Sequence, residues 1–279
     1  MSPTWSDEDP PPPPRIGPGG WWRVAWRGGA LGAVTFGGLG LLLLVRLVER
    51  PVFGMRRPVT PWITQGVCRM AFVILRLPLT VRGPRIKGPG AVVANHSSWL
   101  DIFALNARKN VYFVSKSEVA GWPGIGWLAR ATGTVFIRRD PREAAAQTET
   151  FRERLLQGHR LLFFPEGTST DGMRVLPFKS TLFAAFFAEN LRHDMSIQPV
   201  SVVYHAPGGA DPRFYGWWGD MDFGPHLVTM LAARRQGRVE LIYHPPVAVD
   251  EFPNRKSLAR YLEGQVRDGH ALAIKATED

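Results

Sequence analysis

The sequence predicts an α/β fold, in which a mostly parallel central sheet is flanked by helices and preceded by N-terminal helices that associate with a membrane. Two observations predict it. From residue 79 onward, short apolar runs alternate with helical patterns, which is typical of a parallel sheet covered on both faces. Earlier in the chain, residues 28–45 carry no charged side chain. The chain of 279 residues is long enough for one sizeable domain with an appendage.

Residues 1–27 form the first segment, a predicted disordered tail that ends in a membrane anchor. Residues 10–14 are all proline and residues 17–20 read Gly-Pro-Gly-Gly, a composition that cannot bury a core and predicts disorder through residue 20. Tryptophan and arginine residues then interleave, as they do at a membrane–water interface: Trp21, Trp22, Arg23, Trp26 and Arg27.

Residues 28–78 form the second segment, predicted as membrane-associating helices. As a helix, residues 28–45 would extend about 27 Å, slightly less than the ~30 Å hydrocarbon core, so this helix either crosses the bilayer or inserts without crossing. Residues 61–77 predict a second, amphipathic helix that lies in the interface and ends at Pro78. Helices packed on a soluble core are the alternative for both stretches.

Composition narrows the class of partner. The excess of 34 Lys+Arg over 24 Asp+Glu favours an anionic partner, either nucleic acid or an anionic membrane. The apolar stretch and the tryptophans favour the membrane, and no zinc-finger, RRM-like or KH-like signature supports nucleic acid. The single cysteine, Cys68, excludes an internal disulfide and fits a reducing compartment. The histidines include no close pair at ligand spacing, so we expect no metal.

Residues 79–279 form the third segment, the globular domain. A helix with one apolar face is predicted over residues 143–157. Apolar runs of strand length predict the central sheet: residues 91–94, 110–114, 134–137, 160–164, 197–204 and 239–243. Because proline cannot donate a ladder hydrogen bond, Pro199 predicts a sheet edge or a bulge beside a pocket.

A histidine and an aspartate five positions apart follow the first of these strands. His96 would lie in the turn after the strand and Asp101 in the next helix, so the carboxylate can fold back onto one ring nitrogen. The other nitrogen is then free to take a proton, as in the base-and-orienter half of a Ser-His-Asp triad. No Gly-x-Ser-x-Gly elbow occurs in the chain, so the hydroxyl would belong to the substrate. A purely structural hydrogen bond is the alternative.

Two further segments carry groups that suit an anionic ligand. Arg138 and Arg139 follow the strand at 134–137, at the edge where open α/β sheets place their sites, and guanidinium groups bind phosphate or carboxylate through two parallel hydrogen bonds. Glu166 and Gly167 follow the next strand, in a turn that can present a carboxylate together with free backbone N–H groups. Surface arginines and a solvated turn are the alternatives.

Taken together and in this order, four segments resemble the motif blocks of the 1-acylglycerol-3-phosphate O-acyltransferase family, the glycerolipid acyltransferases with a His-x-x-x-x-Asp motif. Residues 95–101 read Asn-His-Ser-Ser-Trp-Leu-Asp and match the first block. Residues 133–139 match Gly-x-x-Phe-Ile-x-Arg, residues 164–168 match Phe-Pro-Glu-Gly-Thr, and residues 199–200 match the Pro-Val of the fourth block.

The resemblance covers roughly residues 58–245. It implies an enzyme that transfers a fatty acyl group from a thioester, on acyl carrier protein or coenzyme A, to the hydroxyl of a lysolipid, with no cofactor beyond that co-substrate. It implies that His96 is the general base and Asp101 its orienter. It also associates four residues with the head group of the acceptor: Arg139, Glu166, Gly167 and Thr168.

One position departs from the family pattern. Many members continue Phe-Pro-Glu-Gly-Thr with an arginine, where this chain has Ser169, so one phosphate-pairing cation is missing. Arg138, Arg174 and Lys179 are candidates to replace it. The first expectation for the acceptor is lysophosphatidate, giving phosphatidate. The alternative is lyso-ornithine lipid, an aminolipid without phosphate that a subset of bacterial relatives acylates, alone or as a second activity.

The location and two other function classes complete the predictions. Four arginines within residues 46–57 follow the apolar stretch, and the positive-inside rule then places the catalytic domain, residues 79–279, on the cytoplasmic face of a bacterial inner membrane. A catalytically silent scaffold is disfavoured because the motif residues are all present. A thioesterase is disfavoured because the anchor and arginines favour a lipid acceptor. Trp217 and Trp218 have no role that the sequence defines.

Overall fold

The structure is a computed structural model that describes residues 5–88, 90–138, 142 and 144–276. The α-helices are α1 (Pro18–Phe53), α2 (Thr60–Leu75), α3 (Leu100–Arg108), α4 (Ile125–Thr132), α5 (Ala144–Leu156), α6 (Glu189–Arg192), α7 (Phe223–Ala232) and α8 (Arg255–Lys275). The strands are β1 (Leu79–Arg82), β2 (Gly90–Ala94), β3 (Tyr112–Lys116), β4 (Val135–Ile137), β5 (Arg160–Phe163), β6 (Ser196–His205), β7 (Arg238–Tyr243) and β8 (Val247–Ala248). Short 3-10 helices are η1 (Ser117–Gly121), η3 (Ser180–Phe187) and η4 (Val249–Glu251).

The strands of the described chain form one sheet in the order β1-β7-β6-β2-β5-β3-β4, and β8 pairs with β6 beside this path. Only the pairs that β6 makes with β7 and β8 are antiparallel. The predicted α/β class with a mostly parallel sheet is therefore confirmed. All six predicted strands form, with starts and ends that shift by up to two residues, and the helix predicted over 143–157 is α5.

Pro199 does not lie at a sheet edge, but it lies opposite a bulge, the other outcome that the sequence predicted: three steps along β6, from Ile197 to Val200, face four steps along the segment paired with it, from residue 243 to residue 247. Strand β6 is central, and Pro199 pairs with Val93 of β2 on one side. On the other side, the ladder to β8 reaches only Ile197 and the ladder to β7 begins at Val200. The carbonyl of Pro199 accepts a hydrogen bond from the His244 N–H, in the chain between those two strands. The missing N–H therefore falls in a gap between two ladders, where no hydrogen bond is lost.

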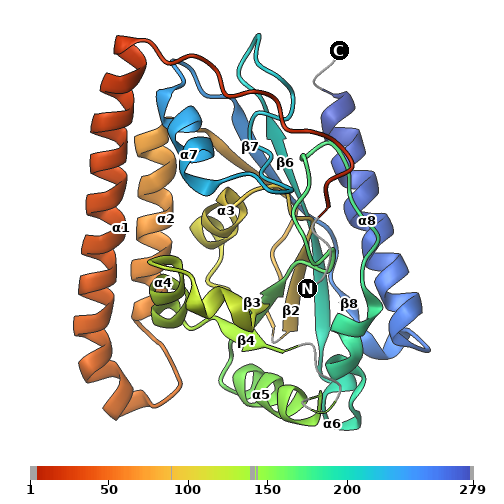
Figure 1. The fold of residues 1–279 in the computed structure, drawn as a ribbon. Helices are drawn as coiled ribbons and strands as arrows, with labels where there is room; N and C mark the ends of the chain where they lie inside the picture. Colours follow the sequence, from red (N-terminus) through yellow and green to blue (C-terminus); the bar gives the residue numbers. More distant parts are fainter. Residues whose placement is uncertain (1–4, 89, 139–141, 143, 277–279) are drawn as a thin grey trace.

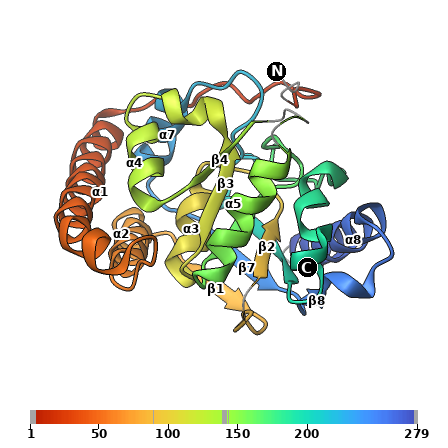
Figure 2. The same cartoon turned by 90° about the horizontal axis from the view of Figure 1, so that it is seen from below.

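Helices cover both faces of the sheet, and the alternating side chains of β2 contribute to a separate core on each face. Val92 and Ala94 pack in the core that includes residues of α2, α3 and α7. Ala91 and Val93 pack in the core that includes residues of α5, α8 and η3. Figures 1 and 2 show α1 and α8 at opposite sides of the molecule.

Helix α1 is longer than the uncharged stretch 28–45 and is long and apolar enough to cross a membrane. It begins at Pro18, inside the predicted tail, and packs against α2 and α7. Arg27, which the sequence placed in an interfacial anchor, is instead buried, and its Nη1 donates to the carbonyls of Leu231 and Ala233 at 2.9 and 2.7 Å. Trp22 does remain exposed, at 71%.

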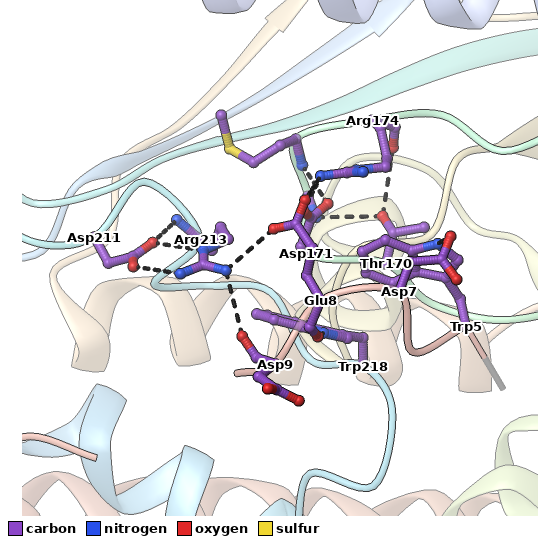
Figure 3. A network of polar contacts seen from close by, with 12 residues as sticks. Trp5, Asp7, Glu8, Asp9, Thr170, Asp171, Arg174, Asp211, Arg213 and Trp218 are labelled. Atoms are coloured by element: carbon purple, nitrogen blue, oxygen red, sulfur yellow. Dashed lines mark hydrogen bonds and ion pairs between the residues drawn. The ribbon is translucent and has the colours of Figure 1, made fainter. Parts of the chain in front are cut away.

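Residues 5–9 lie against two loops of the globular domain, whereas the sequence predicts a disordered tail (Figure 3). Trp5 is buried and packs on Trp218, with ring centroids 6.3 Å apart. The indole N–H of Trp218 donates to the Glu8 carbonyl at 2.8 Å. The Glu8 carboxylate pairs with Arg174 and Arg213. These contacts are made with residues far along the chain, so the local composition does not report them.

Candidate active site

The predicted histidine and aspartate meet at the carboxyl end of β2. The strand ends at Ala94 and α3 begins at Leu100, so the histidine lies in the connecting turn and the aspartate in the first turn of the helix. Asn95 fixes the start of this turn, because its side chain accepts from the Val202 N–H at 2.8 Å and donates to the Val202 carbonyl at 2.9 Å. The turn is thereby attached to the neighbouring strand β6.

His96 and Asp101 form a direct hydrogen bond, with 2.7 Å between Nδ1 and Oδ2. The same carboxylate oxygen accepts the backbone N–H groups of Ser97 and Ser98 at 2.8 and 3.0 Å, and the carboxylate is fully buried. A carboxylate held in this way orients the imidazole with its proton on Nδ1 and leaves the lone pair on Nε2. The histidine side chain is 19% exposed, so Nε2 can be reached by a substrate.

Two aromatic residues that the sequence analysis did not select complete this pair. Phe164 stacks on the His96 ring, with 4.0 Å between centroids and 10° between planes, which limits how the imidazole can turn. The Tyr204 hydroxyl donates to Asp101 Oδ1 at 2.6 Å. Burial raises the pKa of Tyr204 well above its usual value, so this group stays a hydrogen-bond donor. Tyr204 lies 103 positions from Asp101, and no sequence spacing reports that contact.

Glu166 lies behind the histidine turn and not on an open surface. Its two oxygens accept the backbone N–H groups of His96 at 2.9 Å and Leu176 at 3.1 Å, and its side chain is buried. Burial raises its pKa to about 8, against the lowering effect of those two hydrogen bonds. The sequence predicts free backbone N–H groups in this turn. The N–H of Gly167 is not one of them, because it donates to the Phe164 carbonyl at 3.0 Å.

The remaining predicted residues lie in segments of the chain separate from the histidine turn. The Thr168 hydroxyl accepts a 3.3 Å hydrogen bond from the Trp5 N–H. Lys179 is half-buried before η3, and its backbone N–H donates to the Pro165 carbonyl at 2.9 Å. Arg138 is exposed at the carboxyl end of β4, on the same edge of the parallel sheet. Arg139 lies outside the described residues.

Two backbone hydrogen bonds join the histidine turn to loops that the sequence left without a role. The Thr170 N–H donates to the His96 carbonyl and the Trp217 N–H to the Ser97 carbonyl, both at 2.9 Å. Arg174, a candidate replacement for the missing cation, is paired with Asp171 and Glu8 (Figure 3). Among the described residues, no group of three histidine, cysteine, aspartate or glutamate side chains is arranged to hold a metal ion.

Comparison with known proteins identifies the class of enzyme. A family model described as Acyltransferase matches residues 78–203, a range that holds the His96–Asp101 pair and Glu166. The crystal structure of the 1-acyl-sn-glycerophosphate (LPA) acyltransferase PlsC from Thermotoga maritima has a TM-score of 0.57 at 22% identity, covering 90% of this chain and 98% of that one. This likeness shows a shared fold. Fold, site and family model together define an acyltransferase.

Two relatives narrow the family. A lyso-ornithine lipid O-acyltransferase of Rhodobacter capsulatus is 58% identical over 96% of this chain and 97% of its own length. A 1-acyl-sn-glycerol-3-phosphate acyltransferase of Neisseria gonorrhoeae is 39% identical over 40% of this chain and 46% of its own length. The chain therefore belongs to the family of lysolipid acyltransferases that includes both. Its long apolar helix α1 agrees with membrane association.

Proposed function

We propose that the protein is a lyso-ornithine lipid O-acyltransferase, which transfers a fatty acyl group from an acyl thioester to the hydroxyl of lyso-ornithine lipid. The carrying observation is the similarity to the Rhodobacter capsulatus protein, which extends over nearly the whole of both chains. Ser169 supports the proposal, because it stands where many members of the family have an arginine, and an acceptor without phosphate does not need that cation. This proposal reverses the order of the two acceptors expected from the sequence alone, where lysophosphatidate came first.

In the proposed reaction, His96 Nε2 takes the proton of the acceptor hydroxyl while the hydroxyl oxygen of the acceptor attacks the thioester carbonyl carbon. The tetrahedral intermediate then collapses, the carbon–sulfur bond breaks, and the imidazolium returns its proton to the leaving thiolate. Asp101 stabilises the imidazolium between the two steps and is already hydrogen-bonded to Nδ1. General-base catalysis of this kind contributes about 10² to 10⁴ in rate, and proximity of the two substrates contributes much of the rest.

The other predicted residues take two kinds of role in this proposal. Glu166 is a positioning residue, since its carboxylate holds the backbone of His96. Four residues would face the head group of the acceptor: Arg138, Arg139, Thr168 and Lys179. Gly167 would act through its backbone, because its φ of +73° is one that other residues rarely adopt and it shapes the turn after Glu166.

The proposal also covers the carrier of the acyl group and the side of the membrane on which the catalytic domain lies. The acyl group would arrive on acyl carrier protein or coenzyme A, both of which are found in the cytoplasm, and the catalytic domain would therefore face the cytoplasm from the inner membrane. The arginines that follow the apolar stretch of α1 support this orientation through the positive-inside rule.

The test offers purified protein lyso-ornithine lipid and lysophosphatidate in parallel, each with acyl-carrier-protein and coenzyme A thioesters. We expect ornithine lipid as the main product and little free fatty acid, which also separates transfer from thioester hydrolysis. His96→Ala should abolish transfer while the protein still folds and binds membranes. His193→Ala is the matched control, because that side chain is 69% exposed and distant in sequence from the site. Phosphatidate as the main product would overturn the acceptor, and an active His96→Ala variant would overturn the mechanism.

A further inference from the structure

A cleft separate from the active site lies between α1, α4 and α5 and has a volume of about 740 Å³. Arg154, which lines the cleft, donates a hydrogen bond to the carbonyl of Gly133. Gly133 lies just before β4, so the cleft lies near the amino end of that strand. The catalytic turn follows the carboxyl end of β2. Since the two strands belong to the parallel part of one sheet, the cleft is at the opposite, amino edge. Five arginines line it: Arg46, Arg50, Arg57, Arg130 and Arg154.

The positive charge in this cleft is only partly compensated: Glu49 pairs with Arg46, and no described carboxylate forms an ion pair with the other four arginines. None of the described residues that line it is acidic. The nearby Glu49 is buried, and besides Arg46 its carboxylate accepts the Val59 and Thr60 N–H groups and the Thr60 hydroxyl. The guanidinium of Arg57 donates to the Ala131 carbonyl at 2.6 Å, which holds the cation in place without neutralising it.

Burial and neighbouring arginines disfavour the charge of two of these guanidinium groups. Burial and the Coulomb repulsion from Arg57 lower the pKa of Arg154 to about 10. Burial and the repulsion from Arg46 and Arg50 lower the pKa of Arg57. Arg50 itself is exposed, and no described side chain or carbonyl pairs with its guanidinium. Holding like charges together costs stability, and a bound anion would recover it.

The rest of the cleft is apolar and continues into an exposed apolar surface. Leu39 and Leu43 of α1, Met55 and Trp127 of α4 line it, and Trp127 is 65% exposed. Beyond the cleft, α1 exposes further large apolar side chains: Leu41, Leu44, Leu47, Val48, Val52 and Phe53. A ligand that fits this surface has a small anionic group, with two oxygens that can accept hydrogen bonds from one guanidinium, and a hydrocarbon chain attached to it.

We propose that this cleft binds the phosphate group of an anionic membrane phospholipid, with an acyl chain lying along α1. Guanidinium forks match phosphate oxygens, and the apolar wall beside them favours a lipid over a free phosphate. An acidic protein is disfavoured because the cleft opens beside the exposed apolar side of α1, where a bilayer would lie. Such a lipid would fix the orientation of the catalytic domain on the membrane, independently of which acceptor is acylated.

Quenching of Trp127 fluorescence tests the proposal in the full chain, purified in a non-ionic detergent. Phosphatidylglycerol with brominated chains is titrated against phosphatidylcholine with the same chains, and Trp127→Phe isolates the signal of that one tryptophan. The test variant is Arg50→Gln/Arg130→Gln, in which both side chains are exposed. The charge-matched control is Arg255→Gln/Arg260→Gln on α8, at the far side of the molecule from α1 (Figure 1).

We expect saturable quenching by phosphatidylglycerol at concentrations at least tenfold below those needed with phosphatidylcholine. The test variant should need at least tenfold more phosphatidylglycerol, and the control should stay within twofold of the unchanged protein. Equal quenching by the two lipids, an equal loss in both variants, or displacement of the lipid by purified acyl carrier protein would overturn the proposal. If the test variant does not fold, native mass spectrometry of the unchanged protein still decides, because phosphatidylglycerol must be retained in preference to phosphatidylcholine.

Discussion

The histidine turn and the N-terminal segment both depend on carboxylates, but the two carboxylates have different surroundings. Asp101 is fully buried and accepts four hydrogen bonds, three of them from residues within five positions of it. Glu8 is 41% exposed and pairs with two arginines more than 160 positions away. The three local hydrogen bonds of Asp101 need only the turn itself, and the fourth needs Tyr204 of β6. The two ion pairs of Glu8 form only after the whole domain has brought Arg174 and Arg213 together (Figure 3).

The two carboxylates also differ in how much their interactions contribute to the free energy of folding. Exposed ion pairs contribute little, typically about 0 to 1 kcal/mol, because water and salt screen them. A buried carboxylate whose donors are lost is costly, since an uncompensated charge remains away from water. The comparison therefore predicts large effects of changes at Asp101, smaller effects at its distant donor Tyr204, and the smallest effects on the whole molecule in the N-terminal segment.

Asp101→Asn should produce the largest effect, a fall in kcat of about 10³ to 10⁴, because the amide cannot stabilise the imidazolium or fix the same tautomer. The measurement is acyl transfer by purified protein at saturating substrate. Asp211→Asn is the matched control, since Asp211 is paired with Arg213 in a loop at the surface. A variant within tenfold of the unchanged enzyme would mean that Asp101 serves only the structure of the turn.

Tyr204→Phe should lower kcat about tenfold, as expected for losing one hydrogen bond to a charged group worth about 1.5 kcal/mol. The measurement is acyl transfer by purified protein at saturating substrate. Tyr215→Phe is the control, because this buried hydroxyl bonds to Gln236 and the Gly237 N–H instead. An equal fall in kcat in both variants would reduce Tyr204 to a packing role.

The sequence could predict those parts of the molecule whose contacts are local or repeated. Six of the strands were predictable because each contains a short apolar run, and the His96–Asp101 pair because the turn closes within five residues. The turn pattern and the motif resemblance both indicated Glu166 but not its position, since a carboxylate that holds a backbone N–H behind the site and one that faces a ligand have the same sequence.

The sequence could not predict contacts that join distant segments. Tyr204 reaches Asp101 only because β6 pairs with β2, and the five arginines of the cleft are drawn from residues 46 to 154 by the packing of α1, α4 and α5. The proline-rich composition predicts a disordered tail, and residues 5–9 form no helix or strand. It cannot indicate that Trp5 is buried against Trp218, because this depends on a surface that the folded domain provides.

Trp5→Ala tests that last point and should have the smallest effect on the whole molecule. A fully integrated core tryptophan costs about 3 to 5 kcal/mol when truncated, but a terminal segment can detach locally and leave the domain folded. We therefore expect the global free energy of unfolding to fall by less than about 1 kcal/mol, while amide exchange in residues 5–9 becomes as fast as in an unfolded chain. Trp22→Ala, at an exposed position, should change neither quantity. A global loss of several kcal/mol would show that the segment folds as part of the core, and its contacts would then be as integral to the fold as those of the histidine turn.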